Sequence, residues 1–276
     1  MNKVEEFLSL NTGIEVFYRC WFPSESKDVV VGVHGLAEHS GRYTHLGEYL
    51  AKNGYGFCMM DLRGHGRTAE KTEKGYVKKF EEFVYDLEFF IKNIVERTGY
   101  SSVHLFGHSM GGLISVYYAG LIGKNIETLI TSGAAVYLPL PILMKILISL
   151  VNAISPKSRA KIPINPSELS TDLDVGRRYI EDPLVIKTLT MKLISELYGA
   201  STRVWRYVDD IKVPALIMHG ENDQIVPVEA SYRLYNALKV EDKQLKIFPQ
   251  MKHEILNEKN NQVVLDTMMN WLRSHQ

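Results

Sequence analysis

Three polar side chains far apart in the sequence could together carry out acyl transfer: Ser109, Asp223 and His253. A serine hydroxyl is a weak nucleophile at neutral pH and needs a base to take its proton. Histidine, with an ordinary pKa of about 6.5, suits that task, and a carboxylate can fix its tautomer and offset the imidazolium charge. The chain order serine, acid, histidine differs from the orders of two well-known protease types and fits an open parallel sheet.

The surroundings of Ser109 predict a strand, a tight turn and a helix. Residues 103–106 are apolar and β-branched at their start, and residues 113–121 carry apolar side chains at helical spacing. Between them, Gly107 to Gly111 spells Gly-x-Ser-x-Gly. Backbones come close in such a turn, so we expect that a Cβ at Gly107 or Gly111 would clash. By itself the pentapeptide also fits an ordinary glycine-rich turn, so the other catalytic groups must be found.

The acid and the base are expected on loops at the carboxyl ends of the last two strands, where open parallel sheets place their functional groups. A strand predicted over 215–219 is followed by Glu221 and Asp223, and a strand ending at Phe248 is followed by His253. His253 is favoured because it alone follows the final strand. Asp223 is favoured over Glu221 because it lies nearer the apex of its loop.

Other titratable residues near strand ends are interpreted as structural. Asp61 precedes the serine, so we expect it to have a structural role or to form an ion pair with Arg63. The histidines lack metal-ligand spacing and no cysteine cluster exists, so neither a metal nor another cofactor is expected. Six further histidines could act as structural hydrogen-bonding groups: His34, His39, His65, His104, His108 and His219.

An oxyanion hole would need two backbone amides beside the nucleophile. The first candidate is Met110, directly after Ser109. The second is Leu36, which follows the early buried strand 29–33 through His34 and Gly35, a pair that can form a tight turn at a strand end.

The elements around these residues alternate between strand and helix, which predicts an α/β fold with a mostly parallel sheet and helices on both faces. Residues 4–22 predict an additional hairpin around Asn11-Thr12-Gly13. The alternation stops after Ser132, and residues 134–208 show helical segments punctuated by prolines and no clear strand. We therefore predict a core in two parts, 1–133 and 209–276, interrupted by a helical cap over 134–208.

Composition narrows the class of protein. A chain of 276 residues suits one large domain with an insertion, and 32 basic residues balance 32 acidic ones, so a nucleic-acid partner is not expected. The N-terminus carries Glu5 and Glu6 where a signal peptide would be apolar, and no run of 18 apolar residues exists, which predicts a cytoplasmic protein. Cys20 and Cys58 fall in predicted strands and are expected to be buried thiols rather than a disulfide.

The cap contains an unusually apolar segment, 141–154. As a helix it would confine Lys145, Ser149 and Asn152 to one narrow polar stripe, leaving the rest of its circumference apolar. Either this helix is buried on nearly every side, or part of it faces an acyl chain, a membrane or a micelle. Three apolar side chains around the expected site are candidate substrate contacts: Leu138, Ile142 and Val226.

These residues together resemble the monoacylglycerol lipase and lysophospholipase branch of the α/β-hydrolases. The resemblance implies Ser109, Asp223 and His253 as the triad, amides of Leu36 and Met110 as the oxyanion hole, and no cofactor. It further implies that Glu38 and Arg42 belong to a loop network near the alcohol-binding end. The chain departs from the usual pattern at Ala37, commonly glycine, and Thr68, commonly serine. The matching segments are 34–43, Asp61-Leu62-Arg63-Gly64-His65-Gly66, Gly107-His108-Ser109-Met110-Gly111-Gly112, Asp182-Pro183-Leu184-Val185, and His219-Gly220 with Asp223.

The expected substrate is a small lipid ester, first a monoacylglycerol and second a lysophospholipid or another medium- or long-chain ester. An aminopeptidase of the same fold is an alternative, and a non-catalytic binding protein is another that the apparently complete triad disfavours. A haloalkane or epoxide hydrolase would carry aspartate in place of Ser109. The aminopeptidase would need an acidic group in the cap to hold an amine, for which the sequence offers Glu168, Asp172, Asp174, Glu181 and Glu196.

Overall fold

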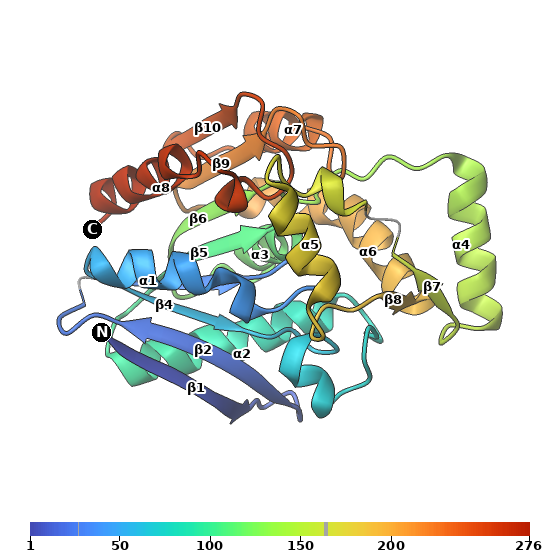
Figure 1. Cartoon of the computed structure of the whole chain (residues 1–276), viewed down its shortest axis with the longest axis horizontal. Helices are drawn as coiled ribbons and strands as arrows, with labels where there is room; N and C mark the ends of the chain where they lie inside the picture. The colour runs from blue at the N-terminus through green and yellow to red at the C-terminus, as the bar shows by residue number, and fades with distance from the viewer. Residues whose placement is uncertain (27, 163–164) are drawn as a thin grey trace.

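The computed structural model describes residues 1–26, 28–162 and 165–276. Its centre is an eight-stranded sheet with the order β1-β2-β4-β3-β5-β6-β9-β10 (Figure 1). The N-terminal hairpin strand β2 is antiparallel to β1 and β4, and the other neighbouring strands of this sheet are parallel. The predicted α/β architecture and its hairpin are thus confirmed. The strands are β1 (Asn2–Ser9), β2 (Glu15–Phe22), β3 (Asp28–Val33), β4 (Tyr55–Met60), β5 (Val103–His108), β6 (Ile126–Ser132), β9 (Ala215–Gly220) and β10 (Lys243–Phe248).

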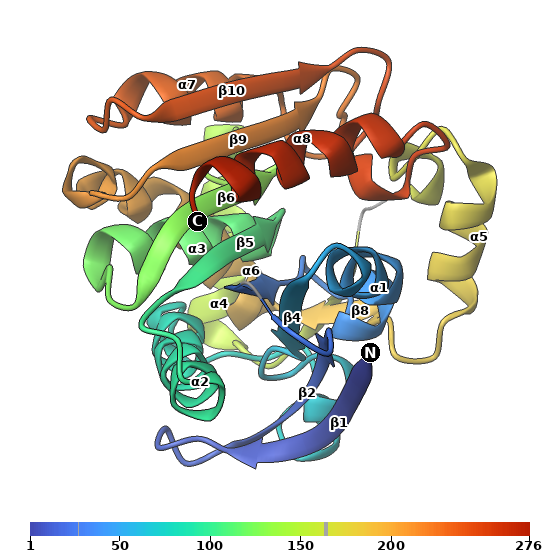
Figure 2. The same ribbon diagram turned by 90° about the vertical axis from the view of Figure 1, so that its left-hand side faces the viewer.

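Helices cover both faces of the sheet (Figure 2). α1 (Thr44–Lys52) and α8 (Gln262–Ser274) pack in one apolar layer, while α2 (Glu81–Thr98), α3 (Met110–Leu121) and α7 (Glu229–Ala237) pack in the other. Alternate side chains of a strand point to opposite faces, so Val29 of β3 belongs to the second layer and its neighbour Val30 to the first. Parallel pairing also brings the carboxyl ends of β5, β6, β9 and β10 to one edge, where the candidate site lies.

Between β6 and β9, the described residues form the helices α4 (Ile142–Ile154), α5 (Leu173–Glu181) and α6 (Met191–Arg203). It also contains two short strands, β7 (Arg159–Lys161) and β8 (Thr188–Thr190), which pair antiparallel. The expectation that 134–208 lacks strands was therefore wrong, because three residues are too few to show an alternating pattern. Short 3₁₀ helices complete the chain: η1 (Ser40–Tyr43), η2 (Gly66–Glu70), η3 (Pro166–Glu168), η4 (Val204–Arg206), η5 (Val208–Asp210) and η6 (Ile255–Asn257).

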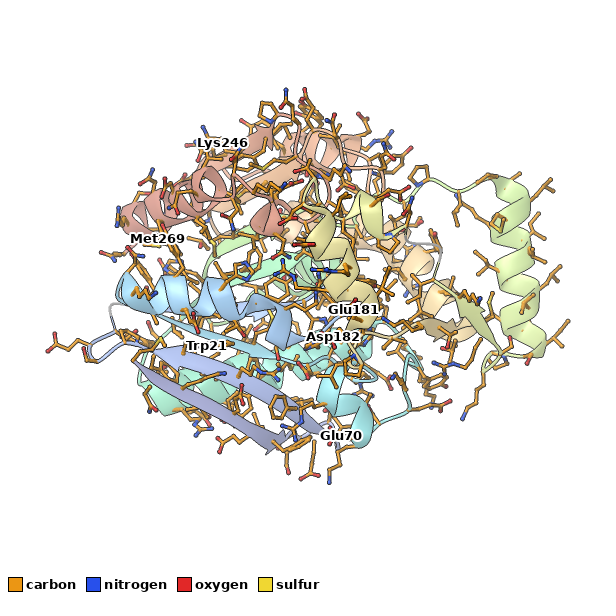
Figure 3. All side chains as sticks on the ribbon, viewed as in Figure 1. Trp21, Glu70, Glu181, Asp182, Lys246 and Met269 are labelled. Atoms are coloured by element: carbon orange, nitrogen blue, oxygen red, sulfur yellow. A yellow bond between two sulfur atoms is a disulfide. The ribbon has the colours of Figure 1, made fainter. Side chains whose placement is uncertain are left out.

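α4 stands at the right-hand end of the molecule in Figure 1, away from the sheet. None of its residues is buried, and its side chains project from the helix, many of them away from the rest of the chain (Figure 3). Of the two alternatives for this segment, burial on nearly every side is therefore wrong. Within residues 1–26, 28–162 and 165–276, no helix combines the length and the apolar character needed to span a membrane.

Cys20 and Cys58 form a disulfide between β2 and β4. Both residues are buried, as predicted, but the expectation of free thiols was wrong. The antiparallel register places Cys20 directly opposite Cys58, with their Cα atoms 4.1 Å apart. That register depends on how the hairpin pairs with β4, which the position of a cysteine in its own strand does not reveal.

Candidate active site

Ser109 occupies the turn between β5 and α3 with φ 54° and ψ −118°. This left-handed conformation is unfavourable for a residue with a Cβ, by about 1–3 kcal/mol, and persists only where neighbours enforce it. Here Ser109 N donates to Ser132 O at 2.9 Å, and Ser109 O accepts from Ala135 N at 3.0 Å. The segment after β6 therefore holds both sides of the strained residue.

Gly107 and Gly111 are needed for close approach of neighbouring backbones. A Cβ on Gly107 would lie 2.5 Å from Gly111 O, and one on Gly111 would lie 2.1 Å from Val33 O. Both distances are too short for real contacts, so the predicted clash at each glycine is confirmed. α3 can consequently begin directly against β3 and β5, with the amide of Met110 in its first turn, where amides lack a carbonyl partner within the helix.

The structure brings Asp223 and His253 together. His253 Nδ1 lies 2.6 Å from Asp223 Oδ2, and both side chains are buried. A carboxylate can only accept, so Nδ1 carries the proton and Nε2 is left as the basic nitrogen. Burial lowers the pKa of His253, but the charge and hydrogen bond of Asp223 outweigh it, and the net pKa lies above the ordinary value.

The carboxylate of Asp223 is fully supplied with donors. Its Oδ1 accepts from the amides of Ile225 at 2.8 Å and Val226 at 2.9 Å, and His219 Nε2 lies 3.0 Å from Oδ2. Burial opposes ionisation, but the charge of His253 and the hydrogen bonds from His219 and His253 hold the pKa of Asp223 well below its ordinary value. Asp223 is therefore an ionised acceptor at neutral pH, fixed in one orientation.

Glu221, the rival acid, does not face His253. Its side chain is exposed and accepts only a long hydrogen bond of 3.3 Å from Gln250 N among the described contacts. The geometry of the loop thus favours Asp223, although the catalytic roles of the three residues stay predictions.

The remaining histidines near strand ends each have a hydrogen-bonding partner outside the candidate triad. His34 Nε2 accepts from Leu62 N at 2.9 Å, and His39 Nε2 lies 2.9 Å from Asp182 Oδ2 at the C-terminal end of α5 (Figure 3). His65 Nδ1 lies 2.9 Å from Arg63 O, and His104 Nδ1 lies 2.8 Å from Thr128 Oγ1.

His108 stands beside the candidate base, with its ring centre 4.7 Å from that of His253. Burial, followed by the charge of His253, lowers the pKa of His108 to about 4. His108 is therefore neutral at physiological pH, and its Nδ1 donates to Ser132 O at 3.1 Å.

Asp61 is structural, but its expected ion pair with Arg63 was wrong. Asp61 accepts from the amides of Ser40 and Arg67 at 2.8 Å each, whereas Arg63 binds Asp86 on α2. The two side chains bind different segments, which their closeness in sequence does not show.

The loop after β3 is shaped by Glu38. Glu38 Oε1 accepts from Gly35 N at 2.6 Å and from Tyr43 Oη at 2.7 Å, and Leu36 lies between Gly35 and Glu38 on the cavity wall. Ala37 has φ 69°, the conformation that explains why glycine is common there, and its carbonyl accepts from Ile186 N of the insertion at 2.8 Å.

Arg42 joins this loop to the one that carries His253. Arg42 Nη1 lies 2.8 Å from Glu38 Oε2, and Nη1 and Nη2 each lie 2.8 Å from an oxygen of Glu254. Burial opposes ionisation of Glu38, but Arg42 and nearby histidines hold its pKa below the ordinary value. Glu254 therefore joins the predicted network of Glu38 and Arg42. The sequence did not predict this role, although Glu254 directly follows His253.

Ser109, His253, Leu36 and Met110 line one cavity of about 610 Å³. Most of its wall is apolar, and α4 contributes Met144, Leu147, Ile148 and Val151, which recur at helical spacing on one side of the helix. Of the predicted substrate contacts, Leu138, Val226, Glu38 and Arg42 line this cavity. Ile142 does not: its side chain is 69% exposed on the outer side of α4. The apolar segment alone could not say which side of the helix turns inward.

Gly133 is a further site residue that the sequence did not reveal. It has φ 54°, and a Cβ there would lie 3.2 Å from His253 Nδ1 and 3.4 Å from Asp223 Oδ2. Its position directly after β6 was the available signal. Tyr179 of α5 also lines the cavity, with its ring 4.9 Å from the Arg42 guanidinium carbon.

In the part of the chain that the structure describes, no three or more His, Cys, Asp or Glu side chains gather in a way that could hold a metal ion. The site thus consists of a strained serine, a buried acid–histidine pair and an apolar cavity.

An open, mostly parallel sheet with this arrangement at its carboxyl edge defines an α/β-hydrolase-fold serine hydrolase. A family model described as serine aminopeptidase, S33, matches residues 24–260. The chain belongs to this family.

Individual relatives agree with this class. A Mycolicibacterium smegmatis protein named monoacylglycerol lipase is 29% identical over 268 residues, which cover 95% of this chain and 94% of the relative. The Bacillus subtilis phospholipase YtpA is 25% identical over 242 residues, covering 86% and 92% of the two chains. The crystal structure of Paleococcus ferrophilus monoacylglycerol lipase has a TM-score of 0.84 and 32% identity, covering 95% of this chain and all of that one. The resemblance predicted from the motifs is confirmed, and the chain is a hydrolase of the lipase and esterase type.

Proposed function

We propose that the protein hydrolyses monoacylglycerols through an acyl-enzyme on Ser109, with His253 as the base and Asp223 as the acid that orients it. The observation that carries this proposal is the 2.6 Å contact between Asp223 and His253 at the wall of an apolar cavity that Ser109 also lines.

The reaction would follow the steps of a serine hydrolase. Ser109 Oγ attacks the ester carbonyl carbon while His253 Nε2 takes its proton, and the amides of Leu36 and Met110 hold the negative oxygen. His253 then gives the proton to the departing alcohol. A water molecule activated by His253 attacks the acyl-enzyme and releases the fatty acid.

The substrate class is inferred from the two ends of the cavity. The acyl chain would lie against the apolar side chains of α4 and Leu138, and the alcohol would face the group formed by Glu38, Arg42 and Glu254. Relatives named monoacylglycerol lipase support a glycerol ester as the first substrate. Lysophospholipids and other medium- or long-chain esters are further candidates, which the relative named phospholipase supports.

We also propose that residues 134–208 form the cap of this site and that α4 contacts a membrane or micelle. The outer side of α4 exposes Ile142, Leu143, Ile146, Leu150 and Ile154. Apolar side chains gathered in this way on one exposed helix are typical of surfaces that contact lipid or another protein. A lipid surface would also be the source of the substrate.

Aminopeptidase activity is the alternative, since it uses the same fold and triad. It would need a carboxylate able to bind the substrate amine. Glu38 and Glu254 both bind Arg42, and Glu196 of the cap binds Lys192 and Arg203. Glu168 lines the cavity and is the strongest remaining candidate for such a role.

The test is fatty-acid release from a chain-length series of monoacylglycerols, beside a lysophosphatidylcholine and an aminoacyl-naphthylamide, with Ser109→Ala as the blank. Cleavage of the glycerol esters with a chain-length optimum is the expected result. Cleavage of the amide alone would replace the proposal with a peptidase, and no cleavage of any of the three would favour a non-catalytic protein.

A further inference from the structure

The loop that carries His253 is held on both sides of the histidine, by Glu258 on one side and by the insertion on the other. Lys252 N donates to Glu258 Oε1 at 2.8 Å, and Glu254 N donates to Leu169 O at 2.7 Å. Leu169 belongs to the segment between η3 and α5. The backbone amides of the residues before and after His253 are therefore both held by hydrogen bonds, one to Glu258 and one to Leu169.

Glu258 links two segments that are far apart in the sequence. While Oε1 binds Lys252 N, its other oxygen accepts from Thr171 N at 2.9 Å, from Ser170 Oγ at 3.0 Å and from Thr171 Oγ1. We call residues 169–171, which provide these contacts and the one to Glu254 N, the cap strap. One carboxylate oxygen thus serves the His253 loop and the other serves the cap strap.

The burial of Glu258 makes this link an informative feature. The residue is only 4% exposed. A buried carboxylate is costly unless donors satisfy it, and here the donors are two backbone amides and two hydroxyls. An apolar side chain could fill the same space and would need no donors. What a glutamate adds at this position is the ability to hydrogen-bond both segments at once.

A catalytic histidine requires this kind of support. His253 must keep Nδ1 on Asp223 while Nε2 reaches the serine, and a displacement of about 1 Å can reduce turnover on the order of 100-fold. His253 lies on a loop rather than within a strand, so the hydrogen bonds donated by the amides of Lys252 and Glu254 help to restrict the backbone on either side of it.

We propose that Glu258 is a positioning residue for His253, and that it acts by tying the histidine loop to the cap strap. The proposal rests on the proposed triad. The proposal implies that the part of the insertion around Ser170 and Thr171 stays in place during turnover, because this part helps to hold the base. This holds whether or not α4 moves.

The experiment compares Glu258→Ala with the cap-strap variant Ser170→Ala/Thr171→Val, which leaves the histidine loop and Glu258 unchanged. The matched control is Glu229→Ala, an exposed glutamate of α7 that pairs only with Arg233 among the described ion pairs. A fluorophosphonate that labels the serine counts the active sites, and a soluble short-chain ester gives kcat and KM per labelled site. Ser109→Ala is the blank.

We expect Glu258→Ala to lower kcat per labelled site by about 10- to 100-fold with little change in KM. The cap-strap variant should show part of this loss of kcat. Combining it with Glu258→Ala should lower kcat little further, because both variants break the same connection between Glu258 and the cap strap. The control should behave as wild type.

The pH profile of kcat/KM provides a second readout. The charged or titratable groups that face His253 are Asp223, His108, Glu254 and Glu38. If the loop that carries His253 loosens, the contact between His253 and Asp223 weakens and the pKa of His253 falls. The acidic limb of the kcat/KM profile should then move to lower pH. A purely structural role would reduce the labelled fraction or the unfolding temperature and leave this limb in place.

The outcomes separate this inference from the proposed function. Wild-type kcat and an unchanged pH profile in both variants would overturn the role of Glu258 while leaving the triad intact. Inactivity of the wild type on every ester would instead remove the proposed function. If Glu258→Ala does not fold, the cap-strap variant decides: an unchanged kcat there would refute the link.

Discussion

Arg42 binds Glu254 through two parallel hydrogen bonds of 2.8 Å, and so connects the loop after β3 with the loop that carries His253. The same guanidinium holds Glu38 at 2.8 Å, and all three side chains are largely buried. Two carboxylates beside the cavity thus depend on one cation. Removing that cation would leave both carboxylates buried without their positively charged partner, although neutral donors such as Tyr43 Oη and Asn257 Nδ2 would remain.

Arg42→Met should therefore destabilise the fold by about 3–5 kcal/mol, which is the usual result of removing one partner of a buried ion pair. The expected fall in melting temperature is on the order of 10 °C. Thermal unfolding followed by circular dichroism measures it. Arg177→Met is the control, because Arg177 pairs with Asp174 at an exposed position, where ion pairs contribute about 0–1 kcal/mol. Equal melting temperatures for the two variants would contradict the prediction.

Asp223→Asn should lower kcat by about 10⁴-fold, since an amide no longer fixes the protonated Nδ1 of His253. Glu221→Gln, on the same loop but exposed, should keep nearly full activity. Steady-state kinetics on a soluble ester test both variants. The opposite ranking would transfer the role of the acid to Glu221.

The pH dependence of kcat/KM should follow the protonation of His253. Because Asp223 raises the pKa of this histidine above its ordinary value of about 6.5, protonation removes the base at a correspondingly higher pH. Activity should be low in acid and rise with pH through a midpoint above about 6.5. In Asp223→Asn the midpoint should fall. A profile that stays flat between pH 5 and 8 would argue against histidine as the base.

Val151→Trp should shorten the preferred acyl chain. Val151 lies on the side of α4 that lines the cavity, so a larger side chain would occupy space available to the chain end. We expect activity on long-chain monoacylglycerols to fall about 10-fold or more while short-chain esters are still cleaved. Ile142→Trp places the same bulk on the outer side of the helix and should leave the chain-length profile unchanged. Identical profiles for both variants would mean that acyl chains do not reach this wall.

Ile146→Glu/Leu150→Glu should weaken binding to lipid vesicles. These side chains are 49% and 55% exposed on the outer side of α4 and do not line the cavity. Charged side chains on this outer side should reduce the fraction of the protein that sediments with phosphatidylcholine vesicles by about 10-fold. Hydrolysis of a soluble short-chain ester should remain at the wild-type rate. Ser149→Glu, on the polar stripe of the same helix, is the control, and equal sedimentation of the two variants would remove the proposed membrane contact.

Much of the fold could be predicted from the sequence because its signals are local. Strand and helix alternate with clear periods, so the parallel sheet, the N-terminal hairpin and the turn at Ser109 followed from neighbouring residues. The need for Gly107 and Gly111 followed from the tightness of the turn. The candidate triad followed from one topological fact, that parallel strands end at the same edge of a sheet, together with residue types that suit acyl transfer.

Other features depend on contacts between residues that are distant in the chain, and only the tertiary structure decided them. The register of β2 against β4 placed Cys20 opposite Cys58, and the packing of α4 turned Val151 toward the cavity and Ile142 toward solvent. The links between Glu258 and Thr171 and between Arg42 and Glu254 are further examples. A sequence pattern specifies which face of an element is apolar, but the partner of that face is set by the packing of the whole chain.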